Sequence, residues 1–430
     1  MFRISLESRI RLGLAVLTPW LISPVAHAAP ADGVFQVNTY TDYGQVRPLV
    51  ASVGDEYIVV WEHETVFHPG PDGAFGSTQA QRYDSAGCAI GDEFTVNTVT
   101  QGDELPSSVA MSSNGSFVVA WTHALYPQYP GLYPSSIRIQ RFDSAGMPAG
   151  GEQVVKEDEE DGKLAIDDVG DFIVAWEVDT GIAAQRFDSA GTAQAGELEI
   201  VVDDLWGFEL AKAGDGSFVV VWGDRLNNTN CNIVGQRFDA FGGLLDPPFQ
   251  VNTTTVGCGE DPVVEYLADD GFVIVWHRYP GYGKQVLGQT FDSGGQATGA
   301  EFEVHADGTD FQRSPRVAAD PTTGGFVVSW TRQESNSSVD GIKRVLARRF
   351  DAIGQAQASE FEVTPAGVTY DNITGNDIAI GDDGALFVVW NRTDSLGSPV
   401  NEVFGRLIST DGFADGFESG DLTAWSEVVP

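Results

Sequence analysis

The chain has 430 residues, of which 62 are acidic and 24 are basic, so its formal net charge at pH 7 is −38. Such a negative field disfavours nucleic acid and anionic membrane surfaces as partners, while cations, basic proteins and neutral sugars remain compatible. The simplest interpretation of the acidity is that it keeps an exported protein soluble. A hydrophobic share of 42% with 11% aromatic residues indicates a folded chain rather than a disordered acidic one.

Residues 1–28 have the pattern of a secretory signal peptide. A basic start, an apolar stretch and a small-x-small cleavage motif follow one another: Arg3, Arg9 and Arg11, then residues 12–25, then Ala26-His27-Ala28. An N-terminal membrane anchor is the alternative, but Pro19 and Pro24 interrupt the stretch. No later segment approaches the ~18 uninterrupted apolar residues of a spanning helix. We therefore expect a secreted or cell-surface protein without a membrane span, and a monomer.

Seven apolar runs along the rest of the chain each end in tryptophan. The tryptophans lie 46 to 60 residues apart: Trp61, Trp121, Trp176, Trp222, Trp276, Trp330 and Trp390. Self-similarity at such a period indicates one supersecondary unit copied seven times.

Each copy contains four short phrases that read as strands. A small-residue phrase such as 48–51 is followed by a turn such as Asn114-Gly115, which predicts a two-residue β-hairpin. The apolar run, for example 117–121, is typical of a strand covered on both faces. The third phrase (140–143 in one copy) alternates polar and apolar residues, and the fourth (93–97 in another) suits an edge strand.

Four antiparallel strands of falling burial make one propeller blade, so the sequence predicts an all-β, seven-bladed β-propeller over residues 29–412. The first phrase of the mature chain, Phe35-Gln36-Val37-Asn38-Thr39, is a fourth strand without a blade before it. The last copy has three strands and lacks a fourth. The N-terminal strand is therefore expected to complete blade seven. An open β-solenoid is the alternative, but it would leave exposed edges that need caps.

The phrases Phe-Val-Val-x-Trp, Gln-Arg-Phe-Asp-Ser-Ala-Gly and Glu-Phe-x-Val-Asn resemble the repeats of a large group of exported bacterial proteins. The resemblance covers about residues 34–412 and implies β-propellers loosely similar to the FG-GAP repeats of integrin α-chains. Members often carry a calcium-binding Asp-Gly-Asp-Gly loop after the tryptophan, which this chain lacks; only Asp72-Gly73 and Asp340-Gly341 approach it. In the C-terminal tail, residues 413–430, the segment Asp415-Gly416-Phe417-Glu418-Ser419-Gly420-Asp421 with Trp425 following resembles a short C-terminal tag of exported bacterial proteins, and a solvated tail is the alternative.

In a propeller, the loops from fourth to first strand and from second to third strand share the face where ligands usually bind. One set of these loops is rich in aromatic residues, which suit sugar faces or protein contacts. The candidate ligand-binding residues are Tyr126, Tyr129, Tyr133, Trp206, Tyr279 and Tyr282. The alternative is that these rings pack on their own loops.

The fourth-to-first loops are also acidic, which predicts a ring of carboxylates related by the rotation of the repeat. Hard oxygen ligands brought together in this way can hold calcium. The candidate ligands are Asp103, Asp203, Asp204, Asp261, Asp310 and Asp371. For each of them, a turn aspartate that caps its own backbone is the alternative.

Signals for catalysis are weak. His63, His123 and His277 each lie within two residues of a repeat tryptophan, but on three different blades, so a shared zinc site is not expected. Nucleophile-elbow, zinc-protease and phosphate-loop motifs are absent from the sequence. Paired carboxylates for glycoside cleavage could come from the acidic ring, with Asp203, Asp261 and Asp310 as the residues to test.

Two of the three cysteines belong to one face of adjoining blades. Cys231 follows Trp222, and Cys258 leads into blade five, so in an oxidising compartment we predict that they form a disulfide. Cys88 falls in a turn on the opposite face.

Three functions therefore compete. The first is a secreted binding or scaffold propeller that holds a glycan, a protein or a cell-surface polymer, with calcium as a candidate cofactor. The second is a propeller-fold hydrolase or lyase acting on extracellular polysaccharide. The third is a structural repeat protein without a ligand.

Overall fold

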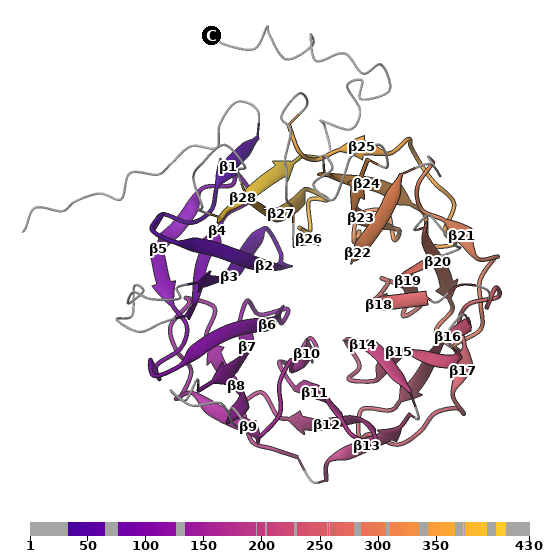
Figure 1. Ribbon diagram of the computed structural model, residues 1–430, viewed down its shortest axis with the longest axis horizontal. Coiled ribbons are helices and arrows are strands. Elements are labelled where there is room, and N and C mark those ends of the chain that lie inside the picture. Colours follow the sequence, from indigo (N-terminus) through magenta and orange to yellow (C-terminus); the bar gives the residue numbers. More distant parts are fainter. Residues whose placement is uncertain are drawn as a thin grey trace, which may run out of the picture.

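The structure, a computed structural model, describes residues 33–64, 76–125, 134–194, 196–202, 204–227, 230–255, 257, 259–278, 285–306, 310–334, 343–365, 373, 375–393 and 401–409. In these residues, 28 strands form seven antiparallel sheets of four strands each. Figure 1 shows the sheets arranged as blades around one axis. The predicted seven-bladed β-propeller is confirmed. Among the described residues, no helix is long and apolar enough to cross a membrane.

Each of the first four blades is built from consecutive strands, with the first strand innermost. Blade one contains β2 (Gly44–Val53), β3 (Glu56–Glu64), β4 (Ser77–Tyr83) and β5 (Ala89–Thr95). Blade two contains β6 (Asp103–Met111), β7 (Phe117–Ala124), β8 (Ser135–Phe142) and β9 (Gln153–Glu157). Blade three contains β10 (Lys163–Ile166), β11 (Phe172–Val178), β12 (Gly181–Phe187) and β13 (Leu198–Val201). Blade four contains β14 (Leu205–Lys212), β15 (Phe218–Asn227), β16 (Asn230–Phe238) and β17 (Phe249–Gln250).

The remaining blades follow the same order, except that the last one takes a strand from the other end of the chain. Blade five contains β18 (Gly259–Tyr266), β19 (Phe272–Arg278), β20 (Gln285–Phe291) and β21 (Phe302–Glu303). Blade six contains β22 (Phe311–Ala319), β23 (Phe326–Gln333), β24 (Lys343–Phe350) and β25 (Phe361–Glu362). Blade seven contains β26 (Asn376–Ile380), β27 (Leu386–Thr393), β28 (Asn401–Ile408) and β1 (Val34–Gln36).

The ring closes through β1, as the sequence predicts. Phe35 pairs with Gly405 in antiparallel register. The Val37 amide then donates to the Val403 carbonyl at 2.8 Å, and the Val403 amide donates to the Asn38 side chain at 2.9 Å. The two ends of the repeat array therefore share one sheet, and no blade edge is left facing a gap in the ring.

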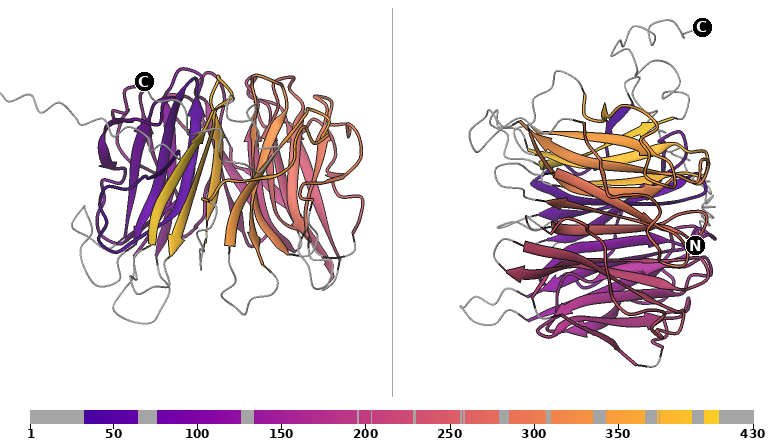
Figure 2. Two further views of the ribbon diagram at one scale, coloured as in Figure 1. Left: turned by 90° about the horizontal axis from the view of Figure 1, so that it is seen from above. Right: turned by 90° about the vertical axis from the view of Figure 1, so that its right-hand side faces the viewer.

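The strands run between two faces of a thick ring (Figure 2). Because every blade is antiparallel, the first-to-second and third-to-fourth connections lie on one face, called here the turn face. The other connections lie on the loop face. The mouth is defined as the loop-face ends of the innermost strands β2, β6, β10, β14, β18, β22 and β26, which surround the axis (Figure 1).

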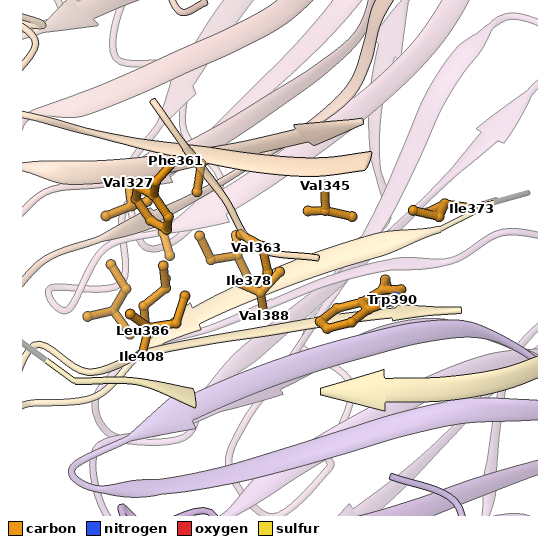
Figure 3. Packing of buried hydrophobic residues seen from close by; sticks show 13 residues of the cluster. Val327, Val345, Phe361, Val363, Ile373, Ile378, Leu386, Val388, Trp390 and Ile408 are labelled. Atoms are coloured by element: carbon orange, nitrogen blue, oxygen red, sulfur yellow. The ribbon is translucent and has the colours of Figure 1, made fainter. Parts of the chain in front are cut away.

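The hydrophobic core lies between neighbouring blades rather than in the middle of the ring. Figure 3 shows the cluster between blades six and seven, where Val327 and Phe361 of one blade pack with Leu386 and Trp390 of the next. Six of the repeat tryptophans are fully buried, and Trp222 is 4% exposed. Each blade thus buries its apolar faces only against its two neighbours, which allows a long chain to fold without one large core.

The turns between first and second strands differ from the prediction of two-residue hairpins. In blade two, the Ser112 amide bonds to the Ser116 carbonyl at 2.9 Å and Gly115 has φ +84°, so three residues close the hairpin. This is a type I turn followed by a left-handed residue, which fits strand twist as well as the two-residue form does. In blade five, Asp270 rather than Gly271 takes the positive φ. Only blade one, with Gly54-Asp55 between Val53 and Glu56, has the predicted two-residue loop among these turns.

The repeated polar residues connect adjacent blades on the turn face. Each arginine of the Gln-Arg-Phe-Asp phrase donates to a backbone carbonyl in a turn of the next blade: Arg82 to Ser144, Arg141 to Ser189, Arg186 to Ala240 and Arg237 to Ser293. Each following aspartate, such as Asp143, accepts amide hydrogen bonds within its own turn.

A repeated glutamate connects the outer strands in the same way. Glu152 at the start of β9 accepts hydrogen bonds from the Thr98 amide at 2.8 Å and the Thr98 hydroxyl at 2.7 Å, across the boundary between blades one and two. Glu93 does the same with Thr39, and Glu301 with Thr253. The repeat sequence therefore encodes inter-blade contacts as well as strands.

Of the cysteines, Cys231 is buried in β16, opposite Arg225. Its predicted disulfide partner, Cys258, lies outside the described residues, so the pairing stays a prediction that non-reducing peptide mapping can test. Cys88 is a free thiol in a turn-face connection.

Candidate functional site

The sequence-predicted site residues divide into two groups. Trp206, Asp103, Asp204, Asp261 and Asp310 belong to the described residues. The others lie outside them: Tyr126, Tyr129, Tyr133, Tyr279, Tyr282, Asp203 and Asp371.

The mouth is built from β-bulges opposite the repeat tryptophans. Register shifts interrupt the innermost strand at this level in five blades. Three of the bulged residues have a left-handed backbone without being glycine: Arg47 (φ +53°), Asp261 (+48°) and Ser314 (+51°). Each precedes a proline. Bulges re-aim side chains, and backbone strain of this kind concentrates at functional sites.

The predicted residues Trp206 and Asp261 come together at the mouth between blades four and five. A Cβ placed on Gly207, next to Trp206 in β14, would lie 3.5 Å from Asp261 Oδ1. Gly207 has φ +64°, so glycine provides both the bulge and the close approach of the two blades. We call the group formed by Trp206, Arg225, Glu260, Asp261 and His277 the mouth site.

Trp206 is the aromatic surface of the mouth site. The indole is 36% exposed, and the Arg225 guanidinium lies 3.5 Å from its ring centroid, in cation–π contact. Gly223 pairs with Trp206 across the sheet, where it has no side chain to cover the ring. A stacked arginine restricts the orientation of the indole, so the ring presents a fixed surface at the mouth.

The polar part of the mouth site comes from blade five. His277 is 4% exposed at its side chain, with Nε2 3.3 Å from Glu260 Oε2 and Nδ1 3.7 Å from Asp261 Oδ2. The side chain of Asp261 is 58% exposed, whereas that of Glu260 is 17% exposed. The buried imidazole thus lies between two carboxylates, one of which faces solvent and approaches Gly207, the neighbour of Trp206. This arrangement offers hydrogen-bond acceptors next to an apolar ring.

The other predicted calcium ligands do not join this group. Asp103 Oδ1 accepts a hydrogen bond from the Gly76 amide at 2.9 Å. Asp310 lies 3.8 Å from Arg332, and Asp204 is an exposed residue whose carbonyl accepts from the Arg225 amide. Within the described residues there is no group of three or more His, Cys, Asp or Glu side chains arranged to hold a metal ion.

The three histidines stay on separate blades, as the repeat predicts. His123 Nδ1 lies 2.9 Å from Glu104 Oε1 in a buried pair at the mouth of blade two. His63 Nε2 lies 3.0 Å from the Asp42 carbonyl, and the Tyr40 ring meets the imidazole edge-on at 5.0 Å. Each imidazole is therefore held by neighbours near its own blade.

Sequence reasoning missed a set of charged residues on the innermost strands. Glu265 of β18 occupies a position at which the six other blades have alanine: Ala51, Ala110, Ala165, Ala211, Ala318 and Ala379. Burial, together with the nearby carboxylates of Asp377 and Glu209, raises the pKa of Glu265 to about 8. Strand alignment of the copies could have found Glu265, because it is the one break in an alanine position.

Two more carboxyls, Asp377 of β26 and Glu62 of β3, have raised pKa values. Burial raises the pKa of Asp377 to about 6, against the lowering effect of Arg316, whose Nε lies 3.8 Å away. In blade one, burial raises the pKa of Glu62 to about 7, although Arg47 lies 3.1 Å from it and acts in the opposite direction.

Comparison with known proteins supports the fold and leaves the activity open. No protein-family model and no curated protein matches the sequence. A solved protein of unknown function from Dyadobacter fermentans is similar, with a TM-score of 0.51 and 12% identity over 87% of this chain and 98% of that one. NanB sialidase from Streptococcus pneumoniae is similar at a TM-score of 0.47 and 9% identity, over 88% and 70% of the two chains. An α-L-arabinanase from Penicillium chrysogenum gives 0.38 and 11%, over 70% and 92%. At these identities the likeness shows the fold alone.

Proposed function

We propose that the protein is an exported binding propeller that holds a carbohydrate at the mouth site. The observation that carries this proposal is Trp206, an exposed residue whose indole is held by Arg225 and whose neighbour Gly207 approaches the Asp261 carboxylate. A sugar ring has an apolar face that packs on an indole and hydroxyls at its edge that donate to carboxylates. Ligand sites generally combine apolar or aromatic surface with a few placed polar groups in this way.

Binding to an array of neutral and acidic oligosaccharides tests the proposal, using the chain without residues 1–28. Trp206→Ala should weaken binding of the best ligand about tenfold or more, because a central tryptophan at an interface often contributes over ~1.4 kcal/mol. Phe241→Ala is the matched control, since Phe241 is 83% exposed in a third-to-fourth connection on the turn face. Equal binding by both variants and the parent chain would contradict the proposal. Failure to bind any glycan would favour the structural alternative.

Calcium enters the proposal as a cofactor of the loop face, to be tested by repeating the array with added calcium and with a chelator. Asp261→Asn keeps a residue type that tolerates a left-handed backbone while it removes the charge. If a cation takes part, this variant should lose the calcium dependence and keep part of the calcium-free binding.

Hydrolysis of polysaccharide is the alternative activity, and no pair of carboxylates stands out for it among the described residues. Asp261 lies beside His277, and Asp310 lies beside Arg332. Activity screening on extracellular polysaccharides with Asp203→Asn, Asp261→Asn and Asp310→Asn addresses this alternative. Turnover that survives all three substitutions would remove these residues as catalysts.

A further inference from the structure

A small cavity opens at the loop-face rim of blade three, on the side that faces blade two. Its volume is about 260 Å³, and it is lined by Val178, Thr180, Ala183, Glu197, Leu198 and Glu199. We call it the rim niche. These residues lie on β11, β12 and β13 or directly beside them, and Figure 1 shows this blade next to blade two, which contains β9. The rim niche is separate from the mouth site, because none of the mouth-site residues lines it.

The rim niche exists because blade three has a small residue where the other blades have larger ones. Ala183 pairs with the repeat tryptophan Trp176. In the six other blades the residue paired with the tryptophan is larger: Gln79, Arg138, Val234, Leu287, Leu346 and Phe404. Because Val178 pairs with Gly181, only two residues join β11 to β12 above the niche. The missing side-chain volume is therefore left open to solvent.

The wall of the rim niche is apolar at its base and acidic at its edge. Val178 and Ala183 provide the apolar part, while Glu199 of β13 and Glu197, directly before it, are exposed and provide two carboxylates. Lys156 of β9 shows which group this edge accepts. Its ammonium lies 2.8 and 3.0 Å from the two carboxylate oxygens of Glu197 and 5.4 Å from the centroid of the Trp176 ring. An aliphatic amine of the chain itself is thus already bound to one of the two carboxylates that line the niche.

The surrounding charge favours a second cation. Burial raises the pKa of Glu159, and the nearby carboxylates of Asp179, Asp158 and Glu177 raise it further, while Lys156 opposes them. One ammonium therefore does not neutralise this part of the rim. Glu199, held by the Thr180 hydroxyl at 2.7 Å, is placed to receive another.

We propose that the rim niche is a docking site for a lysine side chain of a partner protein. The aliphatic stem of the lysine packs on Val178 and Ala183, and its ammonium binds Glu199. A volume of about 260 Å³ lies below the ~300 Å³ at which small-molecule sites begin, which favours a single side chain over a whole organic ligand. The niche also lies beside β13, the outermost strand of its sheet, whose free edge can receive an extended segment of the partner.

Fluorescence anisotropy with a labelled peptide that contains one lysine tests the proposal. The same peptide with acetyl-lysine keeps the stem and removes the charge, and a version with arginine replaces the ammonium by a guanidinium. The lysine peptide should bind, the acetyl-lysine peptide should bind at least about tenfold more weakly, and added salt should reduce the binding. Tighter binding of the arginine or acetyl-lysine peptide would overturn the proposed occupant.

Ala183→Leu is the decisive variant, because it fills the rim niche without changing any charge. Leucine already stands at this position in blades five and six, as Leu287 and Leu346, so the fold has room for it. Binding of the lysine peptide should fall about tenfold, the free-energy equivalent of one modest contact. Unchanged binding would mean that the peptide recognises the acidic surface in general, and would overturn the proposal.

A second pair of variants tests the proposed ion pair without changing the volume of the rim niche. Glu199→Gln removes the proposed carboxylate, and Glu303→Gln removes the carboxylate at the matching position of blade five, where Leu287 fills the space. Only Glu199→Gln should weaken the binding of the lysine peptide. Equal losses of peptide binding in both variants, or no binding of the lysine peptide by the parent chain, would overturn the proposal. Trp206→Ala, at the mouth site, should leave the binding of the lysine peptide unchanged.

Discussion

The two faces of the ring handle backbone strain differently. On the turn face, positive φ angles fall mainly on glycine, as at Gly115 (+84°) and Gly146 (+78°). At the mouth, Arg47, Asp261 and Ser314 adopt positive φ while carrying side chains. Each left-handed non-glycine residue costs roughly 1–2 kcal/mol. Glycine would adopt the same left-handed backbone without this cost, so a side chain kept at such a position is a candidate for a specific role.

Polar contacts follow the same division. The turn face repeats its contacts from blade to blade, so that Arg82, Arg141 and Arg186 each donate to a carbonyl of the next blade. Contacts at the mouth vary more from blade to blade: a His–Glu pair occurs in blades two and five, and the cation–π contact of Trp206 with Arg225 belongs to blade four. Repeated contacts stabilise the ring, whereas the unrepeated ones are candidates for recognition. Four predictions test this division.

The largest effect is expected from the two kinds of tryptophan. Trp276 is fully buried in blade five, whereas Trp206 is 36% exposed at the mouth. Trp276→Ala should lower the free energy of unfolding by about 3–5 kcal/mol, and Trp206→Ala by less than about 1 kcal/mol, because only the first opens a cavity. Urea denaturation followed by circular dichroism measures both. Similar losses in the two variants would show that Trp206 is part of the fold rather than of a site.

The second prediction concerns the repeated glutamate contact between blades. Burial alone would raise the pKa of Glu152, but hydrogen bonds from Arg138 and Thr98 outweigh it and lower the pKa below its usual value. Glu152→Gln should cost about 2 kcal/mol at pH 7, since hydrogen bonds to a charged group are lost.

The sign of the pH dependence follows from this lowered pKa. The stabilisation by Glu152 is complete above its unfolded pKa of ~4.3 and disappears as the pH falls through the lower folded value. Parent chain and variant should therefore converge in strongly acidic solution. Glu157→Gln, at an exposed position of β9, the strand that begins directly after Glu152, should change stability little at any pH.

The buried repeat tryptophans and the exposed Trp206 also show what could be predicted from the sequence. The buried tryptophans recur with the repeat, so periodicity identified the blades and the closure by residues 35–39. Trp206 was predicted to lie in a loop as a ligand-binding candidate, and this placement was wrong: it lies on β14, where its neighbour Gly207 approaches Asp261, which was predicted for calcium. The convergence of blades four and five depends on a bulge at Gly207, and blade four lacks the proline that follows the bulged residue in blades one, five and six. Glu265 was missed because the first strand was described only as rich in small residues.

The third prediction uses Glu265, where blade five departs from the alanine of the other six. A carboxyl with a raised folded pKa holds its proton in the folded state after the unfolded chain has released it. Stability should therefore decline with rising pH between the unfolded pKa of ~4.3 and the folded value of about 8.

Glu265→Ala gives blade five the residue of the other blades and removes the buried carboxyl. Its melting temperature should exceed that of the parent chain at pH 8.5 and approach it at pH 4, as measured by calorimetry. Asp204→Ala, which removes an exposed carboxylate of the loop face, should not change the pH profile. A lower melting temperature for Glu265→Ala at pH 8.5 would mean that the charged group stabilises the ring.

The smallest effect is expected where the mouth keeps a strained residue. Asp261→Gly relieves the left-handed strain and adds freedom to the unfolded chain, and the two terms offset to within about 0.5 kcal/mol. Asp261→Ala has no such relief and loses the tolerance of aspartate for this backbone, so it should be less stable than the glycine variant by about 1 kcal/mol. Chemical denaturation of both variants measures the difference. If Asp261→Gly does not lower the free energy of unfolding but weakens glycan binding, then Asp261 serves recognition. A marked loss of stability in Asp261→Gly would instead show that Asp261 is a structural residue, like the repeated polar residues of the turn face.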